Sequence, residues 1–289
     1  MPELPEVEVV KRSLTNKIQS LIVESIRVRD INLRYQVNKK KLKKLIGLKI
    51  LRVLRKSKFL LFIFEKDLIM LAHLGMTGKF FFINEKNIRY KTSFYYDLNK
   101  KKDNKHNKII FFLSKNQKLI YNDIRKFGFI KIFSKYELKD NIHLKNLGPE
   151  PLSSKFNFKY FKKYLLNKNR TIKDILMDQK FVSGLGNIYV NEILFLSKVK
   201  PMKKTHSIKD REIHKIIKNV KKTLKVAISF GGSSLRDFSS IDGKEGEFQQ
   251  YFKVYGRNGE NCSNENCKER LLKIIIGNRS TFYCKKCQK

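Results

Sequence analysis

The chain opens with Met1-Pro2-Glu3-Leu4-Pro5-Glu6-Val7-Glu8, a stretch that predicts the start of a buried helix. Pro5 suits the first turn of a helix, where its missing N–H costs nothing, and acidic side chains there suit the positive end of the helix dipole. One stripe of apolar side chains follows at helical spacing: Val7, Val10, Leu14 and Ile18. Because such a stripe packs against a core, this helix should hold the chain start in place.

Pro2 gives the same stretch a chemical meaning. If Met1 is removed, the ring nitrogen of Pro2 becomes a free secondary amine. An α-amine has a pKa of about 7.7–8.0, so a useful fraction is neutral and nucleophilic near neutral pH. Attack on an aldehyde-like carbon would give an iminium ion, and Glu3 is adjacent as a proton donor or acceptor. The alternative is a merely structural helix cap, which local physics alone favours.

The charge of the chain indicates a polyanionic partner. The 289 residues are 41% hydrophobic, which allows two domains with a sizeable core. There are 64 Lys and Arg against 26 Asp and Glu, a formal net charge of +38. Such an excess is typical of proteins that bind nucleic acid. A genomic bias towards Lys, Asn and Ile is the alternative, because it raises charge without adding function.

The apolar runs and the N-terminus predict an intracellular, cytoplasmic protein. No apolar run reaches 18 residues, so no membrane span is expected. Glu3, Glu6 and Glu8 stand where a signal peptide needs positive charge followed by an apolar run.

Residues 22–134 predict a β-sandwich, because short apolar runs alternate with turns. The expected strands are 22–28, 50–54, 59–64, 68–71, 80–83, 109–113, 118–121 and 129–133. Two polar loops lie between strands, at 73–78 and 122–128. Segment 84–108 is rich in Lys and Asn, including Lys100-Lys101-Lys102, and is expected to be an exposed insertion.

The second half of the chain predicts helices. A linker is expected around Leu147-Gly148-Pro149-Glu150-Pro151. Helical spacing then marks 158–165, 172–176, a helix opened by Asn187, and one after a capping box of Ser207 with Asp210. The Gly- and Ser-rich residues 231–247 are expected to form a mobile loop.

The four cysteines predict a zinc site. Cys262 and Cys267 have four residues between them, Cys284 and Cys287 have two, and 16 residues separate the pairs. In a reducing compartment this clustering favours a Cys₄ metal site over disulfides. Between the pairs, 273–276 and 280–283 predict a hairpin that turns at Gly277-Asn278 and exposes Arg279.

Four motifs in this order resemble the formamidopyrimidine-DNA glycosylase family, bacterial enzymes that remove oxidised purines from DNA. They are Pro2-Glu-Leu-Pro-Glu-Val-Glu, His73-Leu-Gly-Met, Gly184-Leu-Gly-Asn-Ile-Tyr, and the Arg279 hairpin with its paired cysteines. The resemblance runs from Pro2 to Lys289. It implies an α+β multidomain fold: an N-terminal β-sandwich with flanking helices at 1–134, a linker at 135–152, a helix–two-turn–helix domain at 153–247 and a zinc ribbon at 248–289. DNA would lie in the cleft between domains.

The resemblance also implies roles for single residues. Pro2 would be the nucleophile and Glu3 its acid/base. Lys58 would lie near the lesion phosphates, and Arg279 in the zinc ribbon would grip phosphate. DNA contacts would come from Asn187, His106 and the three residues that fill the gap left by a flipped base: Met76, Arg125 and Phe127. The plain alternative for Met76 and Phe127 is core packing, which their polar loops disfavour. One structural zinc ion, a monomeric state, damaged double-stranded DNA as the partner, and association with the nucleoid through DNA are the further expectations.

The chain departs from the family pattern at three places. The first cysteine pair is spaced by four residues where two are usual, segment 84–108 is longer and more basic, and Lys108 stands where a second histidine often follows His106.

Two other functions remain open. One is endonuclease VIII-like excision of oxidised pyrimidines, which Leu4, Val7 and the pair Arg125/Phe127 disfavour. The other is a non-catalytic zinc-dependent DNA-binding protein, which has no need of a free proline amine.

Overall fold

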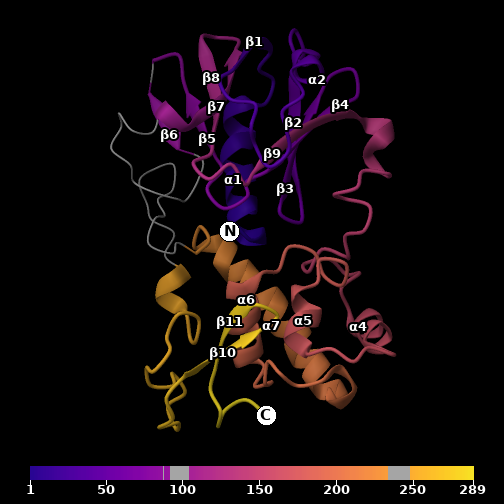
Figure 1. The fold of residues 1–289 in the computed structure, drawn as a ribbon, viewed down its shortest axis with the longest axis vertical. Coiled ribbons are helices and arrows are strands. Elements are labelled where there is room, and N and C mark those ends of the chain that lie inside the picture. The colour runs from indigo at the N-terminus through magenta and orange to yellow at the C-terminus, as the bar shows by residue number, and fades with distance from the viewer. Residues whose placement is uncertain (87, 92–103, 234–247) are drawn as a thin grey trace. The chain divides into compact units, whose positions relative to one another are not determined.

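The computed structural model describes residues 1–86, 88–91, 104–233 and 248–289 (Figure 1). They form two compact units, which we describe separately. The first is Met1–Lys145 with Phe230–Gln249, and the second is Asn146–Ser229 with Gln250–Lys289. Residues 87 and 92–103 of the expected insertion, with Lys100-Lys101-Lys102, and residues 234–247 of the expected loop lie outside the described residues.

Two antiparallel sheets build the first unit and confirm the expected β-sandwich. The first sheet has the order β1-β7-β8-β5-β6 and the second β2-β3-β4-β9. The strands of the first sheet are β1 Val23–Val28, β5 Lys79–Ile83, β6 Arg89–Lys91, β7 Asn107–Leu113 and β8 Gln117–Asn122. Those of the second are β2 Ile50–Lys56, β3 Phe59–Phe64, β4 Leu68–His73 and β9 Phe129–Ser134.

Helix α1, Leu4–Ile18, packs into the sandwich through the expected apolar stripe (Figure 1). The four stripe residues are fully buried, and they share one core cluster with apolar residues of both sheets. Burying an aliphatic side chain contributes about 1.5–3 kcal/mol relative to leaving it exposed. The stripe is therefore sufficient to fix the start of α1 against the sandwich.

Two short elements of the first unit were not expected. Helix α2, Lys39–Lys43, has Asn38 as its N-cap and buries Leu42 alone, so it has no apolar period to read. Strand β6, Arg89–Lys91, extends the first sheet from within the expected insertion. Among the described residues there are also 3-10 turns at Asn104–His106, Lys135–Leu138, Thr205–Ser207 and Phe248–Tyr251.

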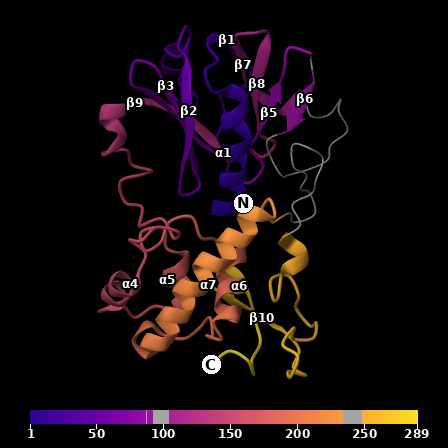
Figure 2. The same ribbon diagram turned by 180° about the vertical axis from the view of Figure 1, so that it is seen from behind.

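Helices dominate the second unit, as expected. They are α4 Phe158–Leu165, α5 Ile172–Met177, α6 Asn187–Leu196 and α7 Asp210–Ser229. Helix α6 is central, because every residue from Ile188 to Phe195 is buried, and it contacts α5, α7 and β11 (Figure 2). The expected capping box of Ser207 with Asp210 is wrong: Ser207 belongs to a 3-10 turn, and the amide of Lys209 donates to Glu212 instead. None of the described helices is long and apolar enough to cross a membrane.

The second unit ends in the expected hairpin of β10, Leu272–Ile276, and β11, Arg279–Tyr283. Its two turn residues, Gly277 and Asn278, both have positive φ, 54° and 58°. This is the conformation of the two-residue turns that match strand twist.

Candidate active site and nucleic-acid interface

The chain start is buried at the first turn of α1. Pro2 is buried, and Glu3 and Glu6 form a capping box in which the Glu3 amide donates to Glu6 Oε2 at 2.8 Å. Burial lowers the pKa of the α-amine of Met1; Glu3 and Glu6 oppose this shift, and Lys58 and Arg125 add to it. An amine with a lowered pKa is more often neutral, which is the nucleophilic form.

Glu6 also holds a distant segment against the chain start. Its Oε1 accepts from the amide and from the hydroxyl of Ser233, at 2.9 and 3.0 Å. Gly232 lies so close that an added Cβ would be 3.1 Å from Glu6 Oε1. The carboxylate therefore stabilises both the helix start and the backbone that follows α7.

The Glu8 carboxylate fixes the turn that carries Lys58 against the start of α1. Glu8 accepts from Arg55 Nε at 2.8 Å, and the same guanidinium donates to the carbonyl of Ser57 at 3.1 Å. Ser57 and Lys58 form the turn between β2 and β3, and Lys58 is only 6% exposed. The ammonium group is thus held by a short turn that is tied to α1.

His73 belongs to the same neighbourhood, although no role was expected for it. It ends β4, stacks on Phe129 at 5.5 Å between ring centroids, and accepts from the amide of Gly75 through Nδ1. Burial first, and then the charge of Lys58, lowers the pKa of His73 to about 4. The imidazole is therefore neutral near neutral pH. Its place in the His-Leu-Gly-Met motif is the sequence signal that pointed to it.

The two polar loops present the three expected gap-filling residues. Met76 and Phe127 are 36% and 44% exposed, so neither belongs to the core. The guanidinium of Arg125 lies 4.7 Å from the centre of the Phe127 ring, a cation–π contact that preorganises the pair. Exposed apolar side chains on fixed loops are suited to insertion between bases.

Asp123, fully buried, joins these two loops. Its Oδ1 accepts from the hydroxyl of Thr77 at 2.6 Å, and its Oδ2 accepts from the amide of Gly128 at 2.8 Å. Thr77 Oγ1 in turn accepts from the amide of Arg125 at 2.9 Å. The carboxylate thus fixes both loops relative to each other, a role that the sequence did not reveal.

Gly75 and Gly128 allow the loops to approach this closely. Gly75 has a φ of 62°, and an added Cβ there would be 2.4 Å from the backbone nitrogen of Gly128. An added Cβ on Gly128 would be 2.6 Å from the carbonyl oxygen of His73. Any side chain at either position would force the loops apart.

His106 lies in the 3-10 turn before β7, and its carbonyl accepts from the amide of Asp123 at 3.1 Å. Lys108, in the place of a second histidine, is buried and forms an ion pair with Asp30 at 3.0 Å. Hydrogen bonds from Lys126 and Lys108 hold the pKa of Asp30 well below its usual range. Lys108 therefore has a structural partner within the first unit.

In the second unit, Asn187 and the Arg279 hairpin are brought together. Asn187 opens α6 and donates through Nδ2 to the carbonyl of Ser280 at 3.0 Å. Lys173, buried in α5, donates to the same carbonyl at 3.2 Å and to Thr281 Oγ1 at 2.6 Å. Burial and the charge of Arg279 lower the pKa of Lys173 to about 8. Arg279 remains exposed at the start of β11, where a phosphate could reach it.

Two further side chains of α6 anchor the C-terminal part of the chain. Asn191 Oδ1 accepts from the amide of Phe282 at 2.7 Å. Glu192 accepts from three consecutive amides, those of Lys253, Val254 and Tyr255, at 2.8–3.0 Å. Both side chains fix the hairpin and its entry segment to α6.

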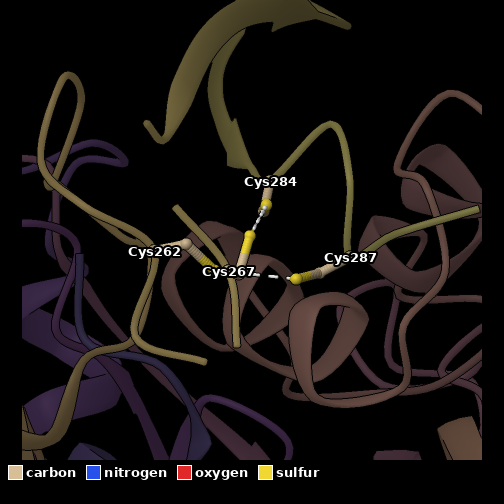
Figure 3. Close-up of side chains that lie close together, drawn as sticks. All are labelled: Cys262, Cys267, Cys284 and Cys287. Carbon is tan, nitrogen blue, oxygen red and sulfur yellow. Dashed lines mark hydrogen bonds between the residues drawn. The ribbon is translucent and has the colours of Figure 1, made fainter. Parts of the chain in front are cut away.

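The four cysteine sulfurs converge on one point (Figure 3). All four lie within 4.8 Å of one another; Cys262 and Cys287 are 3.8 Å apart, and Cys267 and Cys284 are 3.6 Å apart. A tetrahedral ion with metal–sulfur bonds of about 2.3 Å needs sulfurs about 3.8 Å apart. The thiols therefore fit a metal ion despite the longer spacing of the first pair.

Comparison with known proteins gives one consistent result. The model of the formamidopyrimidine-DNA glycosylase N-terminal domain matches residues 1–130, and that of the helix–two-turn–helix domain of the same enzyme matches residues 147–239. The formamidopyrimidine-DNA glycosylases of Rickettsia conorii and Rickettsia bellii are 40% and 39% identical. These alignments cover the whole chain, with 99% and 100% of the relatives.

Solved structures agree. A Lactococcus lactis Fpg mutant in complex with DNA containing Fapy-dG matches with a TM-score of 0.85 and 33% identity over 100% of both chains. A complex of the Lactococcus lactis protein with DNA containing an abasic site matches with the same score and identity over 99% of both. A β-sandwich, a helix–two-turn–helix unit and a four-cysteine ribbon thus define a DNA-repair glycosylase fold. The chain belongs to the formamidopyrimidine-DNA glycosylase family.

Proposed function

We propose that the protein is a bifunctional DNA glycosylase and AP lyase of base excision repair, acting on oxidised purines such as 8-oxoguanine and formamidopyrimidines. The observation that carries the proposal is the buried chain start beside Glu3, Glu6 and Lys58, where burial lowers the pKa of the α-amine against the opposing effect of the two carboxylates. Removal of Met1 would transfer this amine to Pro2, which is already buried at the same corner. A non-catalytic DNA-binding protein has no use for such an amine.

The chemistry follows from a secondary amine beside a carboxyl group. Pro2 N bonds to C1′ as the bond from C1′ to the base breaks; the base leaves with that electron pair and takes up the proton that the Pro2 nitrogen loses. Glu3 protonates the ring oxygen, so the sugar opens to an iminium ion. Loss of a C2′ proton expels the 3′ phosphate and loss of a C4′ proton expels the 5′ phosphate. Water then hydrolyses the iminium and frees Pro2.

The other residues would bind and distort the duplex. A base must leave the stack to reach the amine, at a cost of a few kcal/mol. We assign Met76, Arg125 and Phe127 to the vacated space and Lys58, His106, Asn187 and Arg279 to phosphates. The amides at the start of α6 favour an anion. We assign a structural zinc ion to the four cysteines, because four thiolates leave no open position for catalysis. The protein would act as a monomer on chromosomal DNA in the cytoplasm.

Borohydride trapping on a duplex with one 8-oxoguanine tests the proposal, because hydride converts the iminium into a stable amine link. The protein with Pro2 as its first residue should give a covalent adduct. A form that keeps Met1 should give none, since its Pro2 nitrogen is an amide, which is not nucleophilic, and its free amine is displaced by one residue from the position of the Pro2 nitrogen. Glu3→Gln should slow base excision by about 10²–10⁴-fold, the usual contribution of an acid/base group, while keeping cleavage of a ready-made abasic site.

Each failure has its own meaning. An adduct from the Met1-retaining form would place the amine elsewhere, with Lys58 as the next candidate. Adducts with oxidised pyrimidines but not with 8-oxoguanine would assign the endonuclease VIII-like specificity. DNA binding without any adduct would leave a non-catalytic binder.

A further inference from the structure

Helix α7 carries a continuous stripe of positive charge, the α7 basic stripe. Its five members are exposed and recur every three or four residues: Arg211, Lys215, Lys218, Lys222 and Lys225. At 3.6 residues per turn they fall within an arc of about 80°, and they span about 21 Å of the helix axis. Within the described parts of the chain, none of the five forms an ion pair. The acidic residues Asp210 and Glu212, at the helix start, already pair with Lys162 and Lys203.

A general excess of lysine does not explain this stripe. In α1 the half-buried Lys11 and the exposed Arg12 both lie next to an acidic partner, Glu8. On α7 the stripe cations stand at i,i+3 or i,i+4 from one another, an arrangement that destabilises a helix. Glu212, three positions before Lys215, is buried and pairs with Lys203. A bound polyanion would remove that repulsion.

The stripe faces away from the Arg279 hairpin. The opposite side of α7 is apolar and buried, with Ile213, Ile216, Val220 and Leu224. That side packs on α6, where Asn219 donates to Ser197 at 3.0 Å. Helix α6 is also the element that holds β11, and Figure 2 shows α7 in front of it. A duplex held by Arg279 and Asn187 therefore leaves the stripe accessible.

We propose that the α7 basic stripe binds the phosphate backbone of a second DNA duplex, beyond the proposed lesion site and without sequence preference. A duplex carries one negative charge per about 1.7 Å of axis, so a straight row of five cations complements it along its length. Contacts to phosphates fix the position of a protein on DNA but carry no sequence information, so binding through the stripe should not depend on the base sequence. Binding two duplexes would let the protein pass from one DNA segment to another without entering free solution.

The test uses two short lesion-free duplexes, one with a donor dye and one with an acceptor dye. Wild-type protein should bring them together, and native mass measurement should show one protein with two duplexes. The variant K215Q/K218Q/K222Q/K225Q should lose the second duplex. The matched control K39Q/K40Q/K43Q/K44Q also removes four lysine charges, from exposed positions around α2 in the first unit, and should still bind the second duplex. Both variants should excise 8-oxoguanine from a single short duplex as wild type does.

Salt gives the expected size of the effect. Each neutralised phosphate contributes about −0.9 to the slope of log affinity against log salt, so the four lysines contribute about −3.6. Raising salt from about 50 to about 200 mM should then reduce the contribution of the four lysines to the association constant for the second duplex about a hundredfold.

Three results would overturn the proposal: no complex with two duplexes, equal loss in both variants, or capture of polyglutamate or an RNA duplex in preference to DNA. A protein that holds two duplexes yet excises nothing would refute the proposed function and leave this inference standing.

Discussion

Replacing Asp123 by Asn should separate base flipping from chemistry. The substitution keeps the volume of a fully buried side chain but turns one acceptor oxygen into a donor. In the structure both oxygens face donors, Thr77 Oγ1 at 2.6 Å and the Gly128 amide at 2.8 Å. Whichever way the amide is turned, one buried donor loses its acceptor.

A buried donor without an acceptor costs about 1–3 kcal/mol. The lost hydrogen bond is one of those that join the loops carrying Met76 and Phe127, so the loop arrangement seen in the structure becomes less populated. If about 2 kcal/mol of this cost is felt only in the flipped state, excision from duplex DNA slows about 30-fold, since 1.36 kcal/mol is a factor of ten. Tyr121→Phe removes only a 3.3 Å contact to the same carboxylate and should change the rate much less.

Single-turnover excision of 8-oxoguanine is the assay, on a paired duplex and on a substrate whose lesion is already unstacked. Flipping such a base costs less, so the variant should recover most of the wild-type rate on it. A wild-type rate on the paired duplex would refute the reasoning. An equal loss on both substrates would show instead that the chemistry or the fold is damaged.

Other substitutions test the remaining assignments. Phe127→Ala should slow excision from duplex DNA more than it weakens binding to undamaged DNA; equal losses would indicate a folding defect. Arg279→Ala should reduce the slope of log affinity against log salt by about 0.9, one phosphate contact, and an unchanged slope would exclude that contact. Cys287→Ser or chelation should unfold the hairpin, and metal analysis finding no zinc in fully active protein would exclude the structural role. The pKa of Lys173 is about 8 in the folded protein, against 10.5 for an unperturbed lysine, so between these pH values the unfolded chain binds more protons than the folded one. The free energy of unfolding of the wild type should therefore rise relative to that of Lys173→Met from about pH 8 to about pH 10.5, by about 3 kcal/mol. Denaturant unfolding at both pH values measures this difference.

Local patterns in the sequence predicted the strands, the helices and the hairpin well. Each of these elements has an apolar period or a turn signature of its own, such as the Gly277-Asn278 turn. Helix α2 was missed because it buries a single leucine, and the cap of α7 was misplaced because two acidic residues competed for it. Short-range signals therefore define elements wherever burial is periodic.

The contacts that build the candidate site are of another kind. Asp123 and Thr77 are 46 residues apart, and Lys173 and Thr281 are 108 apart. No local sequence pattern predicts such pairs, because a buried aspartate or lysine has the same local sequence signature as an exposed one. Only the folded structure shows its partner. Motif resemblance pointed to the groups expected to do chemistry, but not to the side chains that hold them.

The hydrogen bonds between Glu6 and Ser233 can form only late in the synthesis of the chain. The two residues are 227 positions apart, so the chain start reaches its final arrangement only after most of the chain has been made. Bacterial ribosomes add about 5–20 residues per second, which puts about 10–45 seconds between the emergence of the two partners. Until then the segment of Gly232 and Ser233 is missing from the surroundings of Glu6 at the chain start. On the proposed function, a nascent or truncated chain that lacks Ser233 should therefore lack strand cleavage, because the site is completed late in translation.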